Sequence, residues 1–470
     1  MHKLRNTSQA WLTALAAFSL VSTACAQTYV SGNISGPWPP SGNLYVATAN
    51  CTVPAGQMLT LQPGVVFLIG SNVTVTANGS LIHAVGTPSQ RITISAASST
   101  FNYNTISLIN PPGTNLFTYC DFTNAQTAIS MGAYSGAVLV DEIFNCTFTS
   151  CSSSAIYGEA QGSAFFGAPY TVNSILSPLI KNCIFYNSSN ACMMKVYGYY
   201  YEGGIGYGIA NPSVNGNVFD NLTGTAFLMI IGSYAGGSAP TFINNTLVNC
   251  RVGVNATDPW DALIQDNIFV GCTNAVMDLG SLSRKVTYND FYGNATNSTG
   301  YSGIGPTIWN NRNGTPADIY YNIFQSPFFV ATNDFHLATN SPCVNAGTPN
   351  PAYANMCRPP SIATNFPDLG AYGGPDACNW LTNVPELAVQ LSLTQSNSFL
   401  WLNWGAIPRS TYLVQYFATN LNATSGTNRW LTNTTLIPAA KPVSIAVSPY
   451  PTTNSKAFYR VRSLGRTPGN

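Results

Sequence analysis

Two short stretches of this chain, Asn245-Thr246-Leu247-Val248-Asn249-Cys250 and Asn267-Ile268-Phe269-Val270-Gly271-Cys272, follow one pattern. In both, an asparagine is followed two residues later by a large apolar residue and five residues later by a cysteine. A small residue and then an apolar one come next, at Gly253-Val254 and Ala275-Val276. The two copies start 22 residues apart, which predicts a repeated structural unit of that length.

The pattern recurs in order through the middle of the chain, with cysteine in place of asparagine in the first copies. Successive copies start 22 to 37 residues apart, so the longer intervals contain insertions. The copies are Cys120-Asp121-Phe122, Cys146-Thr147-Phe148, Cys183-Ile184-Phe185, Asn217-Val218-Phe219, Asn245-Thr246-Leu247, Asn267-Ile268-Phe269, Asn289-Asp290-Phe291 and Asn322-Ile323-Phe324.

A period near 22 residues with short strands and no helical periodicity is typical of a solenoid whose coils each contain about three strands. Stacked coils place equivalent residues about 4.8 Å apart, so that identical side chains form ladders. An inward asparagine can hydrogen-bond the backbone of its own coil and of its neighbours. We therefore predict an all-β fold, a parallel β-helix with inward Asn or Cys and inward Phe at each coil.

The composition agrees with this prediction and excludes several classes of protein. Only 7% of the residues are charged, against about 25% in an average protein, and the net charge is +1. Lys and Arg are too few to form the basic patch that a nucleic-acid-binding protein needs, so we expect no nucleic-acid partner. The 45% hydrophobic and 12% aromatic content predicts a packed core rather than disorder.

Residues 1–26 have the pattern of a secretory signal peptide. Lys3 and Arg5 form a positive segment, an apolar run follows, and Ala24-Cys25-Ala26 supplies a small-x-small cleavage site. An alternative is a lipid anchor on Cys25, although Ser22 stands where a lipid-modified protein carries a large aliphatic residue. No later apolar run is long enough to span a bilayer. We expect a secreted, extracellular or cell-surface protein, and a monomer.

The segments on either side of the repeats carry a resemblance to a known family. Short alternating strands such as Leu59-Thr60-Leu61 and Ile92-Thr93-Ile94 precede the first copy, and Asp334-Phe335-His336-Leu337 and Asp368-Leu369-Gly370-Ala371-Tyr372-Gly373 follow the last. Together with the coils, residues 29–380 resemble the secreted right-handed parallel β-helix proteins of the pectate-lyase-like superfamily. The resemblance implies the fold for residues 27–380; its members include lyases, hydrolases, adhesins and binding proteins.

Residues 381–470 are predicted to form a second domain. The repeat pattern ends, and ordinary alternating strands such as Tyr412-Leu413-Val414-Gln415-Tyr416 take its place. Their number and length suit a small antiparallel β-sandwich. The region resembles the fibronectin-type-III-like tails of exported bacterial proteins, including its terminal Phe458-Tyr459-Arg460-Val461-Arg462.

Insertions at 157–180, 193–214 and 229–243 follow the same strand of successive coils, so they are expected to stack into one wall. The alignment of coils puts Glu159 and Lys195 at equivalent outward positions. One interpretation is a groove in which aromatic rings stack on sugars while Lys195, Glu202 or Glu159 act on the substrate; the other is an exposed Glu–Lys pair under self-packed loops. The tyrosines expected to bind ligand are Tyr197, Tyr199, Tyr200, Tyr201 and Tyr207.

A second group of charged residues lies close together in the predicted coils. Asp258, Asp261 and Asp278 are candidate Ca²⁺ ligands, and Arg251 is a candidate ligand-binding residue beside them. The alternative is that these aspartates form turns and surface pairs, since they occupy different positions of the repeat.

The function expected from the sequence is binding of a polysaccharide or cell-surface glycan, or a structural role at the cell surface. The alternative is a polysaccharide lyase or glycoside hydrolase acting in a groove along the β-helix. The motifs that mark polygalacturonases of this architecture are absent from the chain, and so is a pair of glycosidase carboxylates. Eleven cysteines follow the signal peptide, of which Cys343, Cys357 and Cys378 are the expected source of a disulfide.

Overall fold

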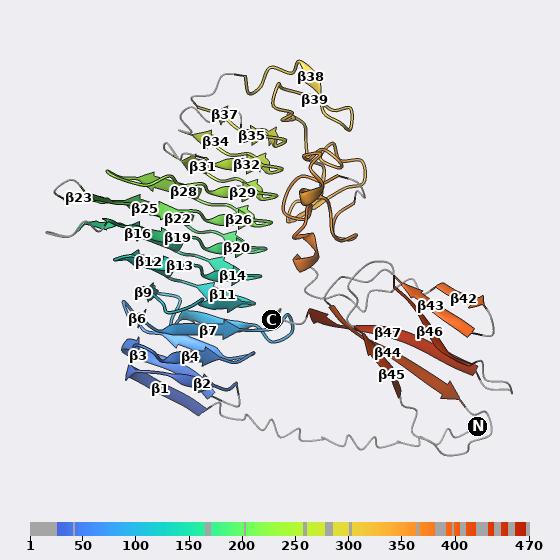
Figure 1. Cartoon of the computed structure of the whole chain (residues 1–470), viewed down its shortest axis with the longest axis horizontal. Helices are drawn as coiled ribbons and strands as arrows, with labels where there is room; N and C mark the ends of the chain where they lie inside the picture. The colour runs from blue at the N-terminus through green and yellow to red at the C-terminus, as the bar shows by residue number, and fades with distance from the viewer. Residues whose placement is uncertain are drawn as a thin grey trace, which may run out of the picture.

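The computed structural model confirms an all-β chain built around a parallel β-helix (Figure 1). Coils stack along the solenoid axis and expose three faces, each a parallel sheet. The structure describes residues 26–40, 43–164, 171–201, 204–256, 261–277, 285–299, 303–362 and 366–380, and the backbone of strands within 392–396, 399–404, 410–419, 431–436, 443–449 and 456–466.

The first face contains the short strands that carry the repeat motif, preceded by strands of the first coils. It starts from β3 (Asn43–Val53), which also pairs with β1 (Ala26–Asn33). The strands that follow are β5 (Val66–Ile69), β8 (Ile92–Ala96), β11 (Cys120–Thr123), β15 (Thr147–Thr149), β21 (Ile184–Tyr186), β27 (Val218–Asp220), β30 (Thr246–Val248), β33 (Ile268–Val270) and β36 (Asp290–Tyr292).

The second face also starts from β3 and contains the longest strands of the coils. They alternate buried and outward residues, as strands with one face on a core must. The strands are β6 (Thr74–Asn78), β9 (Thr105–Ile109), β12 (Thr127–Tyr134), β16 (Ser154–Gln161), β22 (Asn190–Tyr197), β28 (Thr225–Ile231), β31 (Val252–Ala256), β34 (Asn274–Met277) and β37 (Thr296–Ser298).

The third face is a ten-stranded parallel sheet, and the insertions of the middle coils add a small fourth sheet beside it. The ten strands are β2 (Gly36–Trp38), β4 (Met58–Leu61), β7 (Leu81–Val85), β10 (Leu116–Thr118), β14 (Glu142–Phe144), β20 (Leu179–Lys181), β26 (Ser213–Asn215), β29 (Thr241–Ile243), β32 (Leu263–Gln265) and β35 (Val286–Thr287). The small sheet contains β13 (Val138–Leu139), β19 (Ser174–Leu176) and β25 (Gly208–Ala210).

Ladders of identical side chains fill the interior, as predicted. Phe122, Phe148, Phe185 and Phe219 stack on successive coils with ring centroids 4.8–5.0 Å apart and rings within 6° of parallel. Leu247 follows Phe219 in the strand register and is also fully buried, so the interior remains apolar where the aromatic stack stops. Buried apolar area of this kind is the main source of stability for the solenoid.

Each repeat motif is preceded by a residue in the left-handed backbone conformation, which turns the chain from the third face to the first. The φ angles of this column lie between 50° and 67°. Asn, Asp and Gly tolerate this conformation, whereas other residues are sterically strained in it. The column is Tyr119, Asn145, Asn182, Gly216, Asn244, Asp266, Tyr288 and Tyr321.

Residues 341–380 do not form a further coil, which corrects the expectation from the resemblance. In the described part of the chain they make no strand pairing with the solenoid; they run back along the left-handed column instead (Figure 1). We call this segment the strap. The reason is its Gly- and Pro-rich sequence, which forms turns and the short 3₁₀ helices η2 (Pro351–Tyr353) and η3 (Ala377–Trp380).

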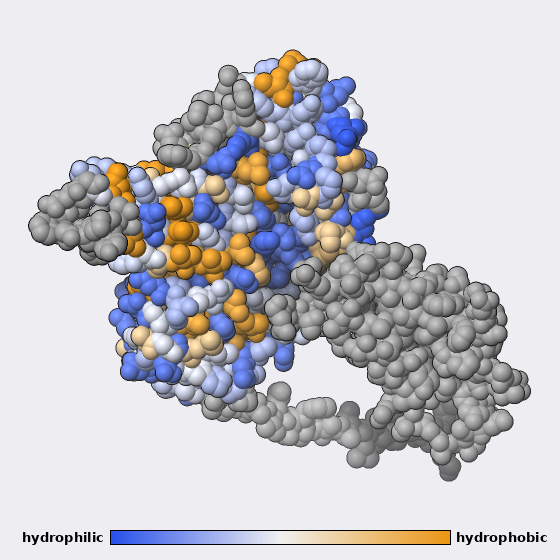
Figure 2. Space-filling view, in the orientation of Figure 1, coloured by the Kyte–Doolittle hydropathy of each residue, from blue (hydrophilic) through white to orange (hydrophobic). Residues whose placement is uncertain are grey.

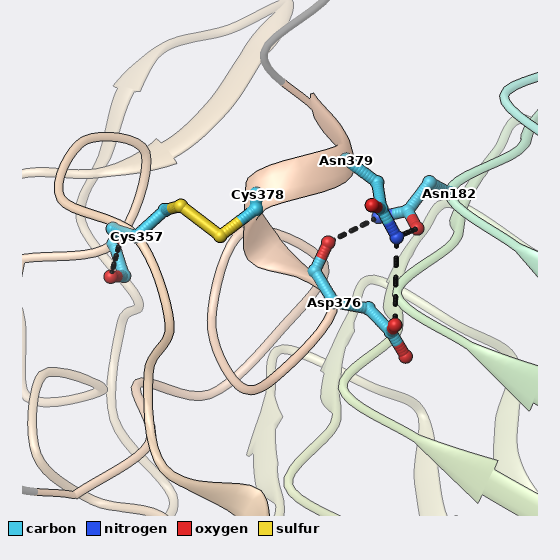
Figure 3. The surroundings of a disulfide bond; sticks show 6 residues. Asn182, Cys357, Asp376, Cys378 and Asn379 are labelled. Carbon is cyan, nitrogen blue, oxygen red and sulfur yellow. Dashed lines mark hydrogen bonds between the residues drawn. A yellow bond between two sulfur atoms is a disulfide. The ribbon is translucent and has the colours of Figure 1, made fainter. Parts of the chain in front are cut away.

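The strap is fixed at several coils. The Thr348 amide donates to Asp266 Oδ1 (2.8 Å), and Asn244 Nδ2 donates to the Asp368 carbonyl (3.0 Å). Near its end Asp376 forms an ion pair with Lys181 (3.1 Å). Figure 3 shows this end of the strap, where Cys357 and Cys378 form a disulfide and Asn182, Asp376 and Asn379 hydrogen-bond one another. Two of the three cysteines expected to supply a disulfide therefore pair, while Cys343 stays free and buried.

The C-terminal strands form two antiparallel sheets of three strands each, so the antiparallel region predicted there is confirmed. One sheet contains β42 (Ser392–Ser396), β43 (Phe399–Trp404) and β46 (Val443–Pro449). The other contains β45 (Leu431–Leu436), β44 (Ser410–Thr419) and β47 (Lys456–Arg466). In the part of the chain that the structure describes, no helix is long and apolar enough to cross a membrane.

Candidate functional site

Outward side chains of two adjacent strands of the second face, β16 and β22, form a polar row that consists of Tyr157, Glu159, Gln161, Lys195 and Tyr197. The strand register pairs Gly132 with Glu159, Glu159 with Lys195, and Lys195 with Ile230. The sequence alignment of Glu159 with Lys195 is therefore confirmed. Because alternate residues of a strand point the same way, Tyr157 and Gln161 stand on either side of Glu159 on β16.

Glu159 is held by tyrosine hydroxyls rather than by the lysine beside it. Tyr157 donates to Glu159 Oε2 (2.5 Å), and Tyr197 from the next coil donates to Oε1 (2.6 Å). The Tyr197 hydroxyl also lies 2.8 Å from the Gln161 side-chain oxygen. The Lys195 amine instead lies over the Tyr197 ring, 4.8 Å from its centroid, in a cation–π contact.

The two tyrosines differ from ordinary phenols in their acidity. Burial raises the pKa of Tyr157 and of Tyr197, and the hydrogen bonds that they donate to the Glu159 carboxylate raise it further. Tyr134 lies in the same neighbourhood, and burial together with the charge of Glu159 raises its pKa too. These hydroxyls therefore remain protonated hydrogen-bond donors over the whole physiological pH range.

Beyond the row, two hairpins extend outward from adjacent coils, as expected for insertions at one corner. They are β17 (Ser163–Ala164) with β18 (Thr171–Val172), and β23 (Tyr199–Tyr201) with β24 (Gly204–Gly206). They contact each other, and β23 projects from the side of the solenoid (Figure 1). Their backbones touch at Gly206, where a Cβ atom would lie 2.1 Å from the Ser163 carbonyl oxygen, so only glycine fits.

The hairpin of β23 and β24 carries exposed aromatic rings next to the polar row. Tyr199 is 50% exposed and Tyr200 53% exposed. Tyr200 stacks on Tyr234 of the following coil with 6.0 Å between centroids, and Tyr199 meets the Tyr197 ring edge-on at 6.0 Å. Solvent-facing rings fixed by neighbours are the usual platform for the C–H faces of a sugar ring.

The other predicted residues of the wall are placed only in part. Tyr207 is half-buried at the foot of the hairpin, where its amide donates to Asn173 Oδ1 (2.9 Å). Tyr201 belongs to β23, but its side chain lies outside the described residues, as does the whole of Glu202. Tyr157 and Gln161 were not predicted; their spacing of two residues from Glu159 on an outward-facing strand was the available signal.

Among the predicted calcium ligands, only Asp261 lies in the part of the chain that the structure describes. Asp261 forms an ion pair with Lys285, while Asp258 and Asp278 lie outside the described residues. Arg251 is exposed at the turn after β30. No group of three His, Cys, Asp or Glu side chains suited to a metal ion occurs among the residues that the structure describes.

A separate apolar strip lies on the small fourth sheet. Val138, Ile175 and Ile209 occupy equivalent outward positions on β13, β19 and β25. Figure 2 shows apolar side chains gathered over these middle coils.

No protein-family model matches the chain, and no curated protein sequence is significantly similar to it. The assignment of a function therefore depends on the geometry described above.

Proposed function

We propose that the protein is exported and binds a polysaccharide or cell-surface glycan on the second face of its β-helix. The observation that carries the proposal is the combination of exposed, fixed tyrosine rings with a row of hydrogen-bonding groups beside them. Tyr199 and Tyr200 offer aromatic faces, while Glu159, Gln161 and Lys195 offer acceptors and donors for sugar hydroxyls. A few directed polar groups next to aromatic surface are typical of sites that bind hydroxylated ligands.

Export is proposed from the signal-peptide pattern of residues 1–26 and is supported by the Cys357–Cys378 disulfide, since such bonds persist in oxidising compartments. We also propose, from the resemblance of residues 29–380, that the solenoid is a right-handed helix of the pectate-lyase-like type. The two antiparallel sheets of residues 381–470 suit a fibronectin-type-III-like tail.

Binding is favoured over hydrolysis or lysis by the arrangement of the acidic groups. A glycoside hydrolase positions two carboxyl groups across the scissile bond, about 5–10 Å apart. Among the described residues of β12, β16, β22 and β28, Glu159 is the single carboxylate, and both of its oxygens already accept tyrosine hydroxyls. The lyase alternative would use the Lys195 amine as the base, and it is tested in the same experiment.

The test is affinity electrophoresis of the purified full-length protein through gels that contain neutral or acidic polysaccharides. We expect at least one polysaccharide to retard the wild type and a Tyr199→Ala/Tyr200→Ala variant to migrate unretarded. A Tyr29→Ala/Tyr292→Ala variant, which removes exposed tyrosines elsewhere, is the matched control and should behave as wild type. Equal retardation of all three proteins would refute the site. Appearance of unsaturated product absorbance that Lys195→Ala abolishes would establish the lyase instead.

A further inference from the structure

Apolar side chains are exposed at the end of the solenoid that carries the hairpin of β38 (Trp309–Asn310) and β39 (Pro316–Ala317) (Figure 1). Ile308 is 65% exposed, Trp309 is 56% exposed, and Figure 2 shows a hydrophobic patch at this end of the molecule. The terminal unit of a solenoid normally has a polar outer face, because no further repeat covers it. Neighbouring apolar side chains at such a position therefore indicate a contact with something outside the chain.

Ile308 and Trp309 stand on a protrusion rather than on a flat surface. Successive residues of a strand point to opposite sides, so a strand that lies flat on the body covers one of each pair. Both side chains are more than half exposed here. The backbone of the hairpin is nevertheless paired, since the Ile308 amide donates to the Ala317 carbonyl (3.0 Å) and the Asn311 amide to the Thr315 carbonyl (2.7 Å). These groups can therefore enter an apolar medium without losing their hydrogen bonds.

The strap holds the hairpin in place from behind. Asn313 Nδ2 donates to the carbonyl oxygens of Pro342 (2.7 Å) and Val344 (2.9 Å), and Asn311 Nδ2 donates to the carbonyl oxygen of Ala346 (2.8 Å). The hairpin is thus ordered before any contact forms. A preorganised contact surface loses little conformational entropy on binding.

The exposed charge on this part of the chain is positive. Residues 303–323 contain two charged side chains, of which Arg312 is exposed and Asp318 is fully buried. The Arg312 guanidinium lies over the Phe366 ring, 4.1 Å from its centroid, which fixes the cation beside the hairpin. A cation next to exposed apolar side chains, with no exposed carboxylate in the same segment, is complementary to anionic lipid headgroups.

A lipid surface suits this hairpin better than a protein partner does. A stable protein interface buries about 800 Å² on each partner and involves about 20–30 residues a side, whereas the hairpin presents a small number of apolar side chains. A protruding side chain also needs a matching pocket on a protein, while a fluid bilayer deforms around it. Trp is enriched at the boundary between headgroups and acyl chains, because its ring is apolar and its N–H is polar.

We propose that the hairpin of β38 and β39 is a membrane-contact site, which inserts Ile308 and Trp309 at the boundary between headgroups and acyl chains of an anionic phospholipid bilayer. Arg312 lies at the level of the lipid phosphates. The contact is peripheral, and it holds the exported protein against a membrane surface. It goes beyond the glycan binding proposed for the second face and does not depend on it.

The test is flotation of the purified full-length protein with vesicles of phosphatidylcholine alone and of phosphatidylcholine mixed equally with phosphatidylglycerol. We expect the wild type to float with the mixed vesicles and to bind the neutral ones more weakly. An Ile308→Ser/Trp309→Ser variant should bind the mixed vesicles at least tenfold more weakly, because two large apolar side chains no longer leave water. Arg312→Gln should weaken binding to the mixed vesicles about fivefold and leave binding to the neutral vesicles unchanged.

A Val138→Ser/Val140→Ser variant is the matched control, since it removes two exposed apolar residues from another part of the solenoid and should float as wild type does. A second measurement reports insertion directly. Brominated acyl chains should quench the tryptophan fluorescence of the wild type, and this quenching should be lost in Trp309→Phe, which keeps an aromatic ring and should still float.

Three results would overturn the proposal. The first is a wild type that floats with neither kind of vesicle, and the second is equal flotation of the wild type and the Ile308→Ser/Trp309→Ser variant. The third is dimerisation in analytical ultracentrifugation that this variant abolishes, without vesicle binding, which would assign the hairpin to a second copy of the chain. Because the vesicles contain no glycan, none of these results bears on the function proposed for the second face.

Discussion

Asn245 Oδ1 accepts two hydrogen bonds from Asn217, which lies at the equivalent position of the preceding coil. The Asn217 backbone amide donates at 2.9 Å and its side-chain Nδ2 at 3.0 Å. The arrangement repeats from Asn245 to Asn267, from Asn267 to Asn289, and from Asn289 to Asn322. Each Nδ2 also donates to a carbonyl of the third face, so every buried amide in the ladder is satisfied.

Removing one member of the ladder should destabilise the solenoid strongly. Asn267→Ala removes the acceptor of the Asn245 backbone amide and one of the two acceptors of the Asn245 Nδ2, and it removes the side-chain donor to the Phe242 carbonyl, all in a fully buried place. We expect a loss of roughly 3–5 kcal/mol in the free energy of unfolding, measured by urea denaturation. Asn33→Ala on the exposed surface of β1 is the control and should change stability by less than about 0.5 kcal/mol. A similarly small effect of Asn267→Ala would contradict the stabilising role of the ladder.

Glu159→Gln should make the tyrosines of the second face easier to ionise. The substitution removes the negative charge that Tyr157 and Tyr197 face while their burial persists, so their pKa values should fall but stay above that of a free phenol. Ultraviolet absorbance during an alkaline titration reports tyrosinate formation. Glu142→Gln on the third face serves as the control and should reproduce the wild-type curve. An unchanged curve for Glu159→Gln would mean that the hydroxyls do not contact this carboxylate in solution.

Burial of Asp266 should make the folded protein more stable at low pH than at high pH. Burial raises the pKa of Asp266 to about 8, although hydrogen bonds from the Thr348 amide and the Gln265 side chain oppose the shift. The folded protein thus retains a proton that the unfolded chain releases near its ordinary pKa of about 4. The stabilisation is complete below that pH and is lost as the pH rises through about 8.

Asp266→Asn replaces the carboxyl group with an amide that does not titrate, so the folded and unfolded states no longer differ in bound protons at this position. We expect the fall in stability between pH 5 and pH 8 to become shallower, by up to about 1.4 kcal/mol per pH unit. Urea denaturation at a series of pH values measures the slope. Burial also raises the pKa of Asp290 to about 8 and of Asp141 to about 7, so part of the slope should remain. Asp261→Asn, at an exposed ion pair, should leave the slope as it is; an identical slope for Asp266→Asn would contradict the assignment.

Loss of the Cys357–Cys378 disulfide should loosen the strap before it affects the coils. The bond closes a loop with a sequence separation of 21 residues, and removing a bond of this kind costs roughly 2–4 kcal/mol. In a Cys357→Ser/Cys378→Ser variant, we expect faster hydrogen exchange at the Ala371 amide, which donates to Thr246 Oγ1 (2.9 Å). Amides of β15 and β21 should exchange as in wild type. Reduced wild-type protein should match the variant, and uniform acceleration throughout the coils would show that strap and solenoid unfold together.

The coil architecture and its interior could be predicted from local sequence. The motif from Cys120 to Asn322 places one Asn or Cys and one Phe or Leu inward at every coil, and parallel stacking then allows a single register in which like side chains meet. The same register predicted that Glu159 and Lys195 would be neighbours, because strand pairing follows directly from the repeat. In a ladder each residue contacts the equivalent residue of the neighbouring coil, so the repeat in the sequence identifies both partners of the contact.

Contacts outside the repeat were decided by the tertiary structure alone. Local sequence could not show that Glu159 would bind Tyr157 and Tyr197 rather than Lys195, because that choice depends on side-chain reach across two coils. Nor could it show that the strap would run back along the left-handed column and bring Arg312 and Phe366 beside Tyr288. The repeat period determines which coils are adjacent, but an aperiodic segment has no equivalent residue to pair with. Its position is set by the buried hydrogen bonds that Asn244 and Asp266 offer, and these exist only once the coils have stacked.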